Sequence, residues 1–258
     1  MNYIGIDIGS TCAKTAVLNE KKEIIQEFVQ PTGWSSVDTA EEIHQKLELA
    51  GISLSDDSSC CVATGYGRIS VPYADKAVTE ITCHALGAVH LFQQPDLTVI
   101  DIGGQDTKII QIEQGFVKDF IMNDKCAAGT GRFLEVMANT LSLRPNEMFD
   151  LARLGSDTTI SSMCTVFAES EVIGLIGKGE PKENIAYAVV DSTIRKVAAQ
   201  VSRMNGEMST FCLTGGLCEC EYIREALSKK LGKEVISSPD ARYAGAIGAA
   251  LRAMKIRK

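Results

Sequence analysis

The sequence has little of several features that define whole classes of protein. It has no apolar run near the roughly 20 residues that cross a bilayer. Its start, Met1 to Asp7, has neither the basic residues nor the long apolar stretch of a signal peptide. Basic residues number 26 against 33 acidic ones, which gives a formal net charge of −7. Because nucleic acids and anionic membranes bind basic surfaces, we expect neither as a partner. The lack of a signal peptide leads us to expect a cytoplasmic protein.

Proline is also scarce, with 6 among 258 residues, and no low-complexity stretch interrupts the chain. A chain of this length can bury one large core or two half-size cores. Hydrophobic residues make up 45% and charged residues 23%, which is typical of a globular protein. We therefore expect one large domain or two lobes that are joined tightly.

Hydrophobic periodicity predicts an α/β protein, with strands mainly in the first half and helices mainly in the second. The predicted strands cover 2–8, 12–19, 22–30, 60–64, 209–213 and 233–236. The predicted helices cover 37–50, 78–91, 129–141, 145–154, 165–178, 182–204, 218–231 and 241–255. The last helix contains small residues from Gly245 to Ala250, which favour close helix packing between lobes.

One pattern of strand, tight glycine turn and strand occurs twice. Gly5-Ile6-Asp7-Ile8-Gly9, followed by Lys14, matches Val99-Ile100-Asp101-Ile102-Gly103, followed by Lys108. The offset is constant, because 101 − 7 and 108 − 14 both equal 94. This duplication predicts two related lobes that face one cleft.

The two glycine turns have the chemistry of phosphate-binding loops. Glycine lets backbone N–H groups approach phosphate oxygens, and an aspartate at each strand end suits a hydrated Mg²⁺ ion. Gln105 would position an attacking water, because phosphoryl transfer depends mainly on positioning and charge stabilisation. The predicted catalytic residues are Asp7, Asp101 and Gln105. The predicted phosphate-binding residues are Gly9, Ser10, Thr11, Cys12, Ala13, Lys14, Gly103 and Gly104.

A third glycine turn follows an apolar strand at Phe211 to Leu213. Its residues Thr214, Gly215 and Gly216 are predicted to let an adenosine lie against the backbone. Taken alone, the same turn would be interpreted as an ordinary connection between a strand and a helix.

Nine cysteines are many for a reducing compartment, which disfavours disulfides. Five lie in apolar or strand-like segments and are predicted to be small core residues: Cys12, Cys60, Cys61, Cys83 and Cys212. Cys126 and Cys164 each precede a predicted helix, whose N-terminal N–H groups favour a thiolate. No Cys-x-x-Cys motif is present, so a 4Fe-4S cluster would need two ligands from each of two chains. By spacing alone, two catalytic or structural thiols remain the alternative.

Four segments carry a resemblance to a known family: "ATGYGR" (63–68), "DIGGQD" (101–106), "NDKCAAGTGRFLE" (123–135) and "CTVFAESEV" (164–172). They closely resemble the activator ATPases of 2-hydroxyacyl-CoA dehydratases, within the wider BadF/BadG/BcrA/BcrD ATPase family. The resemblance runs from Ile4 to about Ala253, and no motif position departs from it. The order of the three glycine turns is also similar to that in the actin, sugar-kinase and heat-shock chaperone superfamily.

The resemblance implies an actin-like ATPase fold with two duplicated ribonuclease-H-like lobes around a nucleotide cleft. Residues 1–95 and a C-terminal helix at about 241–258 would form the first lobe, and 96–240 the second. It further implies a homodimer that is bridged by one 4Fe-4S cluster, held by Cys126 and Cys164, with ATP or ADP and Mg²⁺ in each chain. Two further residues are candidates for ribose or adenine contacts or, equally, exposed surface charges: Glu147 and Arg242.

The function that the resemblance implies is an ATPase that accepts a low-potential electron from ferredoxin or flavodoxin and passes it to a 2-hydroxyacyl-CoA dehydratase. A benzoyl-CoA reductase or a double-cubane cluster protein is an alternative partner. Two other classes remain: a small-molecule kinase on the same fold and an actin-like filament or regulatory module. A kinase needs a catalytic base and a sugar pocket, and the sequence indicates neither.

Overall fold

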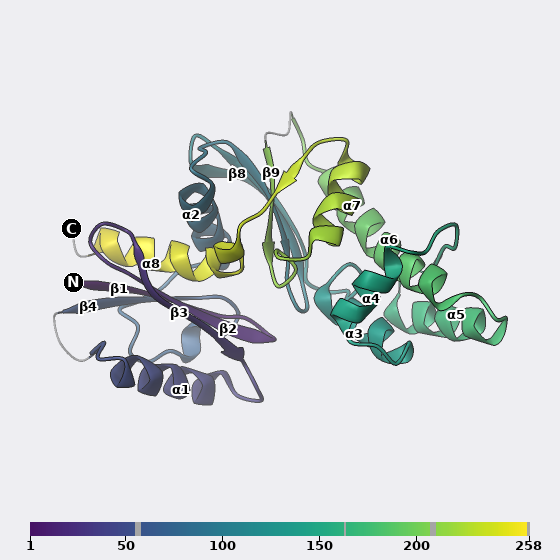
Figure 1. Cartoon of the computed structure of the whole chain (residues 1–258). Coiled ribbons are helices and arrows are strands. Elements are labelled where there is room, and N and C mark those ends of the chain that lie inside the picture. Colours follow the sequence, from purple (N-terminus) through teal and green to yellow (C-terminus); the bar gives the residue numbers. More distant parts are fainter. Residues whose placement is uncertain (55–57, 163, 207–209, 257–258) are drawn as a thin grey trace. The chain divides into compact units, whose positions relative to one another are not determined.

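The computed structural model describes residues 1–54, 58–162, 164–206 and 210–256. The chain forms two compact units and contains two five-stranded sheets (Figure 1). Unit 1 comprises Met1–Leu97, Ile112–Lys118 and Ser238–Lys258, and unit 2 comprises Thr98–Gln111 and Asp119–Ser237. Within the described residues, no helix combines the length and apolar character needed to cross a bilayer.

The first sheet and its helices consist of β1 (Asn2–Ile8), β2 (Cys12–Leu18), β3 (Ile24–Pro31), α1 (Ser36–Leu49), β4 (Ser59–Thr64), β5 (Lys76–Ala77), α2 (Glu80–Phe92) and α8 (Ala244–Ile256). The second sheet and its helices consist of β6 (Leu97–Ile102), β7 (Thr107–Glu113), β8 (Phe116–Asn123), α3 (Gly131–Thr140), α4 (Pro145–Ala152), α5 (Thr165–Gly177), α6 (Lys182–Val201), β9 (Thr210–Gly215), α7 (Glu221–Leu231) and β10 (Val235–Ile236). Two short 3-10 helices are η1 (Arg68–Ser70) and η2 (Pro239–Tyr243).

Strand β1 organises the first sheet. It pairs antiparallel with β2 and parallel with β4, and its Asp7 lies directly opposite Lys14 of β2. Alternate β1 residues face opposite sides of the sheet. The buried isoleucines of β1 pack with α1 in one cluster of core residues: Ile4, Ile6, Ile8, Ile43 and Leu47. Figure 1 shows α1 on one face of this sheet and α8 on the other.

Helix α8 packs closely against β1 and α2 at glycines, which have no side chain. A Cβ atom added at Gly5 of β1 would lie 1.8 Å from the carbonyl oxygen of Ala246, and one added at Gly248 would lie 1.7 Å from that of Cys83. Any larger residue at these glycines would push α8 away from β1 and α2. These small residues of α8 pack inside unit 1, against β1 and α2. Their packing between lobes stays a prediction.

The second sheet repeats the topology of the first. The strand orders are β3-β2-β1-β4-β5 and, taken in the matching direction, β8-β7-β6-β9-β10. This identity confirms the predicted α/β class and the duplication. The core of unit 2 places strand residues Ile100, Ile102 and Ile109 against α3, α4 and α6.

Strand β8 was not predicted. It is the edge strand of its sheet, and its first five residues are all exposed, so it lacks an alternating burial pattern. The duplication held the missing signal, because adding 94 to the bounds of β3 gives 118–125, which overlaps 116–123.

Candidate functional site

The carboxylate of Asp7 lies in a pocket of unit 1 that only glycine neighbours permit. Asp7 is 4% exposed and stands next to the last residue of β1. A Cβ atom at Gly65 would lie 2.4 Å from Asp7 Oδ1, and one at Gly245 would lie 2.4 Å from Asp7 Oδ2. Gly65 also has φ +83°, which disfavours any residue with a side chain. Sequence reasoning noted Gly65 within a motif but assigned it no role.

Asp101 has an equivalent setting in unit 2. It is 3% exposed, and its Oδ1 accepts a hydrogen bond from the hydroxyl of Thr214 at 3.0 Å. Gly215 again has φ +83°, and a Cβ atom there would lie 2.7 Å from Asp101 Oδ1. Each predicted catalytic aspartate is therefore enclosed by a glycine that follows a threonine, Thr64-Gly65 in one unit and Thr214-Gly215 in the other. A buried carboxylate in such a cradle fits the donor chemistry of Mg²⁺.

The two equivalent lysines have different surroundings. Lys108 is 1% exposed, and its Nζ lies 3.2 Å from Asp101 Oδ2 and 2.7 Å from Asp106 Oδ2. Lys14 is half-buried and forms no ion pair with any residue that the structure describes. Lys108 is therefore the counter-ion of two carboxylates, whereas the charge of Lys14 is available to a phosphate. Sequence reasoning did not find Asp106, although it stands where the first copy has Cys12, since 106 − 12 is also 94.

The second glycine turn directs two N–H groups away from α3. The carbonyl oxygens of Gly103 and Gly104 accept hydrogen bonds from the N–H groups of Gly131 and Arg132, at 2.9 and 2.8 Å. In a trans peptide the N–H points opposite to the C=O. The N–H groups of Gly104 and Gln105 therefore point away from α3, and successive N–H groups on one side form an anion-binding concavity. The side chain of Gln105 is exposed.

In unit 1 the first glycine turn is closed by a hydrogen bond of 3.1 Å from the N–H of Gly9 to the carbonyl oxygen of Cys12. Ser10 and Thr11 at its tip are exposed, and Ala13 is buried. The hydroxyl groups of Ser10 and Thr11 can therefore contact a ligand at the tip of the turn.

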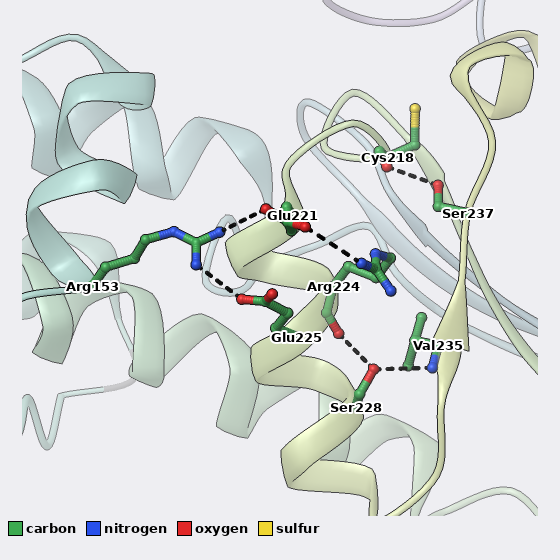
Figure 2. A network of polar contacts seen from close by, with 8 residues as sticks. All are labelled: Arg153, Cys218, Glu221, Arg224, Glu225, Ser228, Val235 and Ser237. Carbon is green, nitrogen blue, oxygen red and sulfur yellow. Dashed lines mark hydrogen bonds and ion pairs between the residues drawn. The ribbon is translucent and has the colours of Figure 1, made fainter.

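The third glycine turn follows β9 and is fixed from two sides. The N–H of Gly216 donates to the carbonyl oxygen of Ile102 at 3.3 Å, which ties this turn to the end of β6. The hydroxyl of Ser237 donates to the carbonyl oxygens of Leu213 and Cys218, at 3.0 and 2.7 Å. Figure 2 shows Ser237 beside Cys218. The turn that is predicted to contact adenosine is thus held rigidly against the strand that carries Asp101.

Helix α7, which follows this turn, is joined to α4 by charged side chains. Arg153 at the end of α4 lies 2.9 Å from Glu225 and 3.5 Å from Glu221 (Figure 2). Its guanidinium stacks 5.2 Å from the ring centre of Tyr222. The hydroxyl of Ser228 donates to the Arg224 carbonyl and accepts from the N–H of Val235. These contacts hold α7, the helix that follows the third glycine turn, in place.

The two candidates for ribose or adenine contacts lie in different units. Glu147 is exposed and accepts hydrogen bonds from the side chain and the N–H of Arg144, both at 2.8 Å, which lower the pKa of its carboxyl group. It caps its own helix, α4. Arg242 lies in η2 of unit 1. Burial and the charge of Asp240 raise the pKa of the Glu27 carboxyl group, and the charge of Arg242 lowers it. The nucleotide contacts of Glu147 and Arg242 stay predictions.

Four of the five cysteines that were predicted to be core residues are buried: Cys60, Cys61, Cys83 and Cys212. Burial raises the pKa of the Cys83 thiol to about 11 and raises those of Cys61 and Cys212 further. The prediction was wrong for Cys12, which is half-exposed at the start of β2 because it adjoins the glycine turn. Cys218 is buried, and Cys220 caps α7, where burial raises its pKa.

Cys126 and Cys164 are accessible thiols of unit 2, in which Cys220 is also partly exposed. Cys164 is exposed and is the N-cap residue of α5, as predicted. Cys126 is half-exposed, but the helix after it begins at Gly131 rather than 129. Since the first two N–H groups of α3 bond to Gly103 and Gly104, the helix does not direct them at Cys126. Both cysteines precede helices, as predicted: Cys164 directly precedes α5, and Cys126 lies five residues before the first residue of α3.

Comparison with known proteins decides the family. The model of the BadF/BadG/BcrA/BcrD ATPase family matches residues 4–253. The chain belongs to this family. The (R)-2-hydroxyglutaryl-CoA dehydratase activating ATPase of Acidaminococcus fermentans is 44% identical, over 98% of this chain and 96% of that protein.

Solved structures agree with the assignment to the BadF/BadG/BcrA/BcrD ATPases. The crystal structure of component A of the Acidaminococcus fermentans (R)-2-hydroxyglutaryl-CoA dehydratase matches with a TM-score of 0.92 and 42% identity, and the match covers 100% of both chains. The activator of the 2-hydroxyisocaproyl-CoA dehydratase from Clostridium difficile, solved with bound ADPNP, matches with a TM-score of 0.89 and 34% identity over 99% of this chain and 95% of that chain. A ROK family glucokinase from Streptomyces griseus, at 17% identity and a TM-score of 0.61, shows the fold alone. These likenesses confirm the predicted actin-like fold.

Proposed function

We propose that this ATPase is a reductive activator: a homodimer with one 4Fe-4S cluster that transfers a low-potential electron to a 2-hydroxyacyl-CoA dehydratase, driven by ATP binding and hydrolysis. The observation that carries the proposal is the pair of accessible thiols, Cys126 and Cys164, in a chain whose relatives are activators of such dehydratases. Ferredoxin or flavodoxin is the proposed electron donor.

The donor set fits a bridging cluster. Cys126 and Cys164 belong to the same unit and are accessible, whereas burial keeps Cys61, Cys83 and Cys212 protonated. Two thiolates per chain meet the four-thiolate requirement only when two chains share the cluster. When bound, the cluster supplies one-electron transfer at low potential.

The residues of the glycine turns would hold the nucleotide. The N–H groups of Gly104 and Gln105, directed away from α3, offer hydrogen bonds to phosphate oxygens. Lys14, which forms no ion pair with a described residue, offers a charge. Asp7 and Asp101 would hold Mg²⁺ through its water shell. The exposed amide of Gln105 would orient the attacking water.

An energy source is required for such a transfer. Raising the energy of one electron by roughly 300 mV costs about 7 kcal/mol, from 59 mV for each tenfold change in the equilibrium constant. A cluster alone does not provide this free energy, whereas hydrolysis of ATP in the same protein does. The combination of nucleotide turns and accessible thiols in one chain therefore favours a driven electron transfer over a simple ferredoxin.

Anaerobic purification tests the cluster directly. The protein is expected to be brown and to hold about two irons per chain, because one four-iron cluster is shared by two chains. Cys126→Ala and Cys164→Ala should each lose the iron and the colour, while the control Cys12→Ala, in the other unit, keeps them. Protein that holds no iron after anaerobic reconstitution contradicts the proposal. Iron-free protein that phosphorylates a sugar with ATP would instead identify a kinase.

A further inference from the structure

The phosphate loop of unit 2, defined here as residues 103–106, is connected to the cysteine loop, defined as residues 124–130, by hydrogen bonds of the residues that flank the two loops. The N–H groups that open α3, immediately after the cysteine loop, donate to the carbonyl oxygens of Gly103 and Gly104. Thr107, the residue after the phosphate loop, donates from its hydroxyl to the carbonyl oxygen of Gly129 at 2.7 Å, in a buried setting. Thr107 is 0% exposed. Both ends of this connection lie in unit 2.

The cysteine loop is braced internally around Cys126. The side-chain amide of Asn123 donates to the carbonyl oxygens of Cys126 and Ala128, at 2.8 and 3.1 Å. The hydroxyl of Thr130 donates to the carbonyl oxygen of Ala127 at 2.6 Å. Because these bonds tie the backbone on both sides of Cys126 into one piece, a shift at Gly129 moves Cys126 as well.

The hydroxyl of Thr107 has no equivalent in the first copy of the duplicated pattern. Subtracting the offset of 94 from 107 gives Ala13, whose side chain has no hydrogen-bonding group. The connection is therefore special to the copy that is followed by a cysteine loop. This position in the strand does not require a hydroxyl for sheet formation, since Ala13 occupies it in β2.

We propose that Thr107 is a positioning residue that couples the phosphate loop to the cysteine loop, so that bound nucleotide phosphates change the reactivity of the Cys126 thiol. The N–H and C=O groups of residues 103–105 are linked by planar peptides. A phosphate that attracts the N–H groups of Gly104 and Gln105 therefore also turns the carbonyl groups that α3 engages. The Thr107–Gly129 bond conveys that shift to the loop before the helix. The consequence for electron transfer rests on the proposed function, but the coupling itself does not.

The test measures alkylation of Cys126 by a maleimide in the full-length, iron-free chain under reducing conditions, with mass spectrometry to resolve each cysteine. Rates are compared without nucleotide, with Mg-ADP and with Mg-ADPNP, and nucleotide binding is measured in parallel. Nucleotides are expected to change the Cys126 rate by about fivefold or more, the lower end of typical coupling between sites. Thr107→Val removes one buried hydrogen bond. It is expected to reduce the nucleotide-dependent change in the Cys126 alkylation rate by about fivefold, while nucleotides still bind.

Two further variants separate coupling from folding. Thr107→Ser keeps the hydroxyl and should retain the nucleotide effect. Thr193→Val is the matched control, since Thr193 in α6 is 0% exposed and its hydroxyl has no hydrogen-bond partner among the described residues; it should also retain the effect. An unchanged Cys126 rate with bound nucleotide, or an intact effect in Thr107→Val, overturns the coupling. Absence of iron after anaerobic reconstitution overturns the proposed function but leaves this result standing.

Discussion

Replacing Lys108 with Met tests the network around Asp101. Lys108 lies within 3.2 Å of Asp101 and within 2.7 Å of Asp106, and the side chains of Lys108 and Asp101 are 2% and 4% exposed. The substitution leaves two carboxylates close together without their cation, one of them fully buried. Removing one partner of a buried ion pair costs about 3–5 kcal/mol, because the remaining charge keeps its desolvation penalty. In a chain of this size such a loss lowers Tm by about 6–20 °C.

The assay is denaturation by urea and by heat, with Lys118→Met as the matched control. Lys118 pairs with Glu113 at 2.8 Å, but their side chains are 46% and 57% exposed, so this loss should cost less than about 1 kcal/mol. Adding Asp106→Asn to Lys108→Met should recover part of the stability, since it removes one of the two repelling carboxylates. The reasoning is refuted if Lys108→Met is no more destabilising than Lys118→Met.

Three further predictions concern single residues. Asp101→Asn should abolish ATP hydrolysis while keeping the iron, because Asp101 and the two cysteines serve different ligands; iron loss in this variant would contradict that separation. Gly65→Ala should impair hydrolysis and cost at least about 1–2 kcal/mol by denaturation, since its φ of +83° and the 2.4 Å approach to Asp7 exclude a methyl group. The pKa of Cys83 rises from 9.0 to about 11 on folding, so the folded state binds more protons between these values and the free energy of unfolding should fall as pH rises from 9 to 11. Cys83→Ala should flatten this fall, and an unchanged slope would refute the assigned burial effect.

Much of the fold was predictable because the duplication is written in the sequence. The constant offset of 94 between Asp7 and Asp101 predicts two related lobes, and the structure shows two sheets of one topology. The same offset also explains why Lys14 and Lys108 have different surroundings. The position of Cys12 in the first copy corresponds to Asp106 in the second, which gives Lys108 a second carboxylate partner. A local motif match does not reveal this, because it compares shared residues and passes over those that differ.

Other features depend on contacts between segments that are distant in sequence. The start of α3 at Gly131 is set by carbonyl groups of Gly103 and Gly104, so helical periodicity around 129 does not locate it. The role of Gly65 appears only when β4 lies beside β1, which brings its turn to Asp7. Edge strand β8 was missed because its apolar residues occur in runs and do not alternate regularly with polar ones.

Electron transfer to a dehydratase is expected to depend on the bound nucleotide. The chain, purified and reduced without oxygen, is mixed in a stopped-flow spectrometer with a 2-hydroxyacyl-CoA dehydratase, and its oxidation is followed with Mg-ATP, with Mg-ADP and without nucleotide. We expect rapid oxidation together with phosphate release with Mg-ATP alone, and no oxidation in the Cys126→Ala variant. Oxidation at the same rate without nucleotide, or ATP hydrolysis that leaves the reduced protein unchanged beside an active dehydratase, would contradict it.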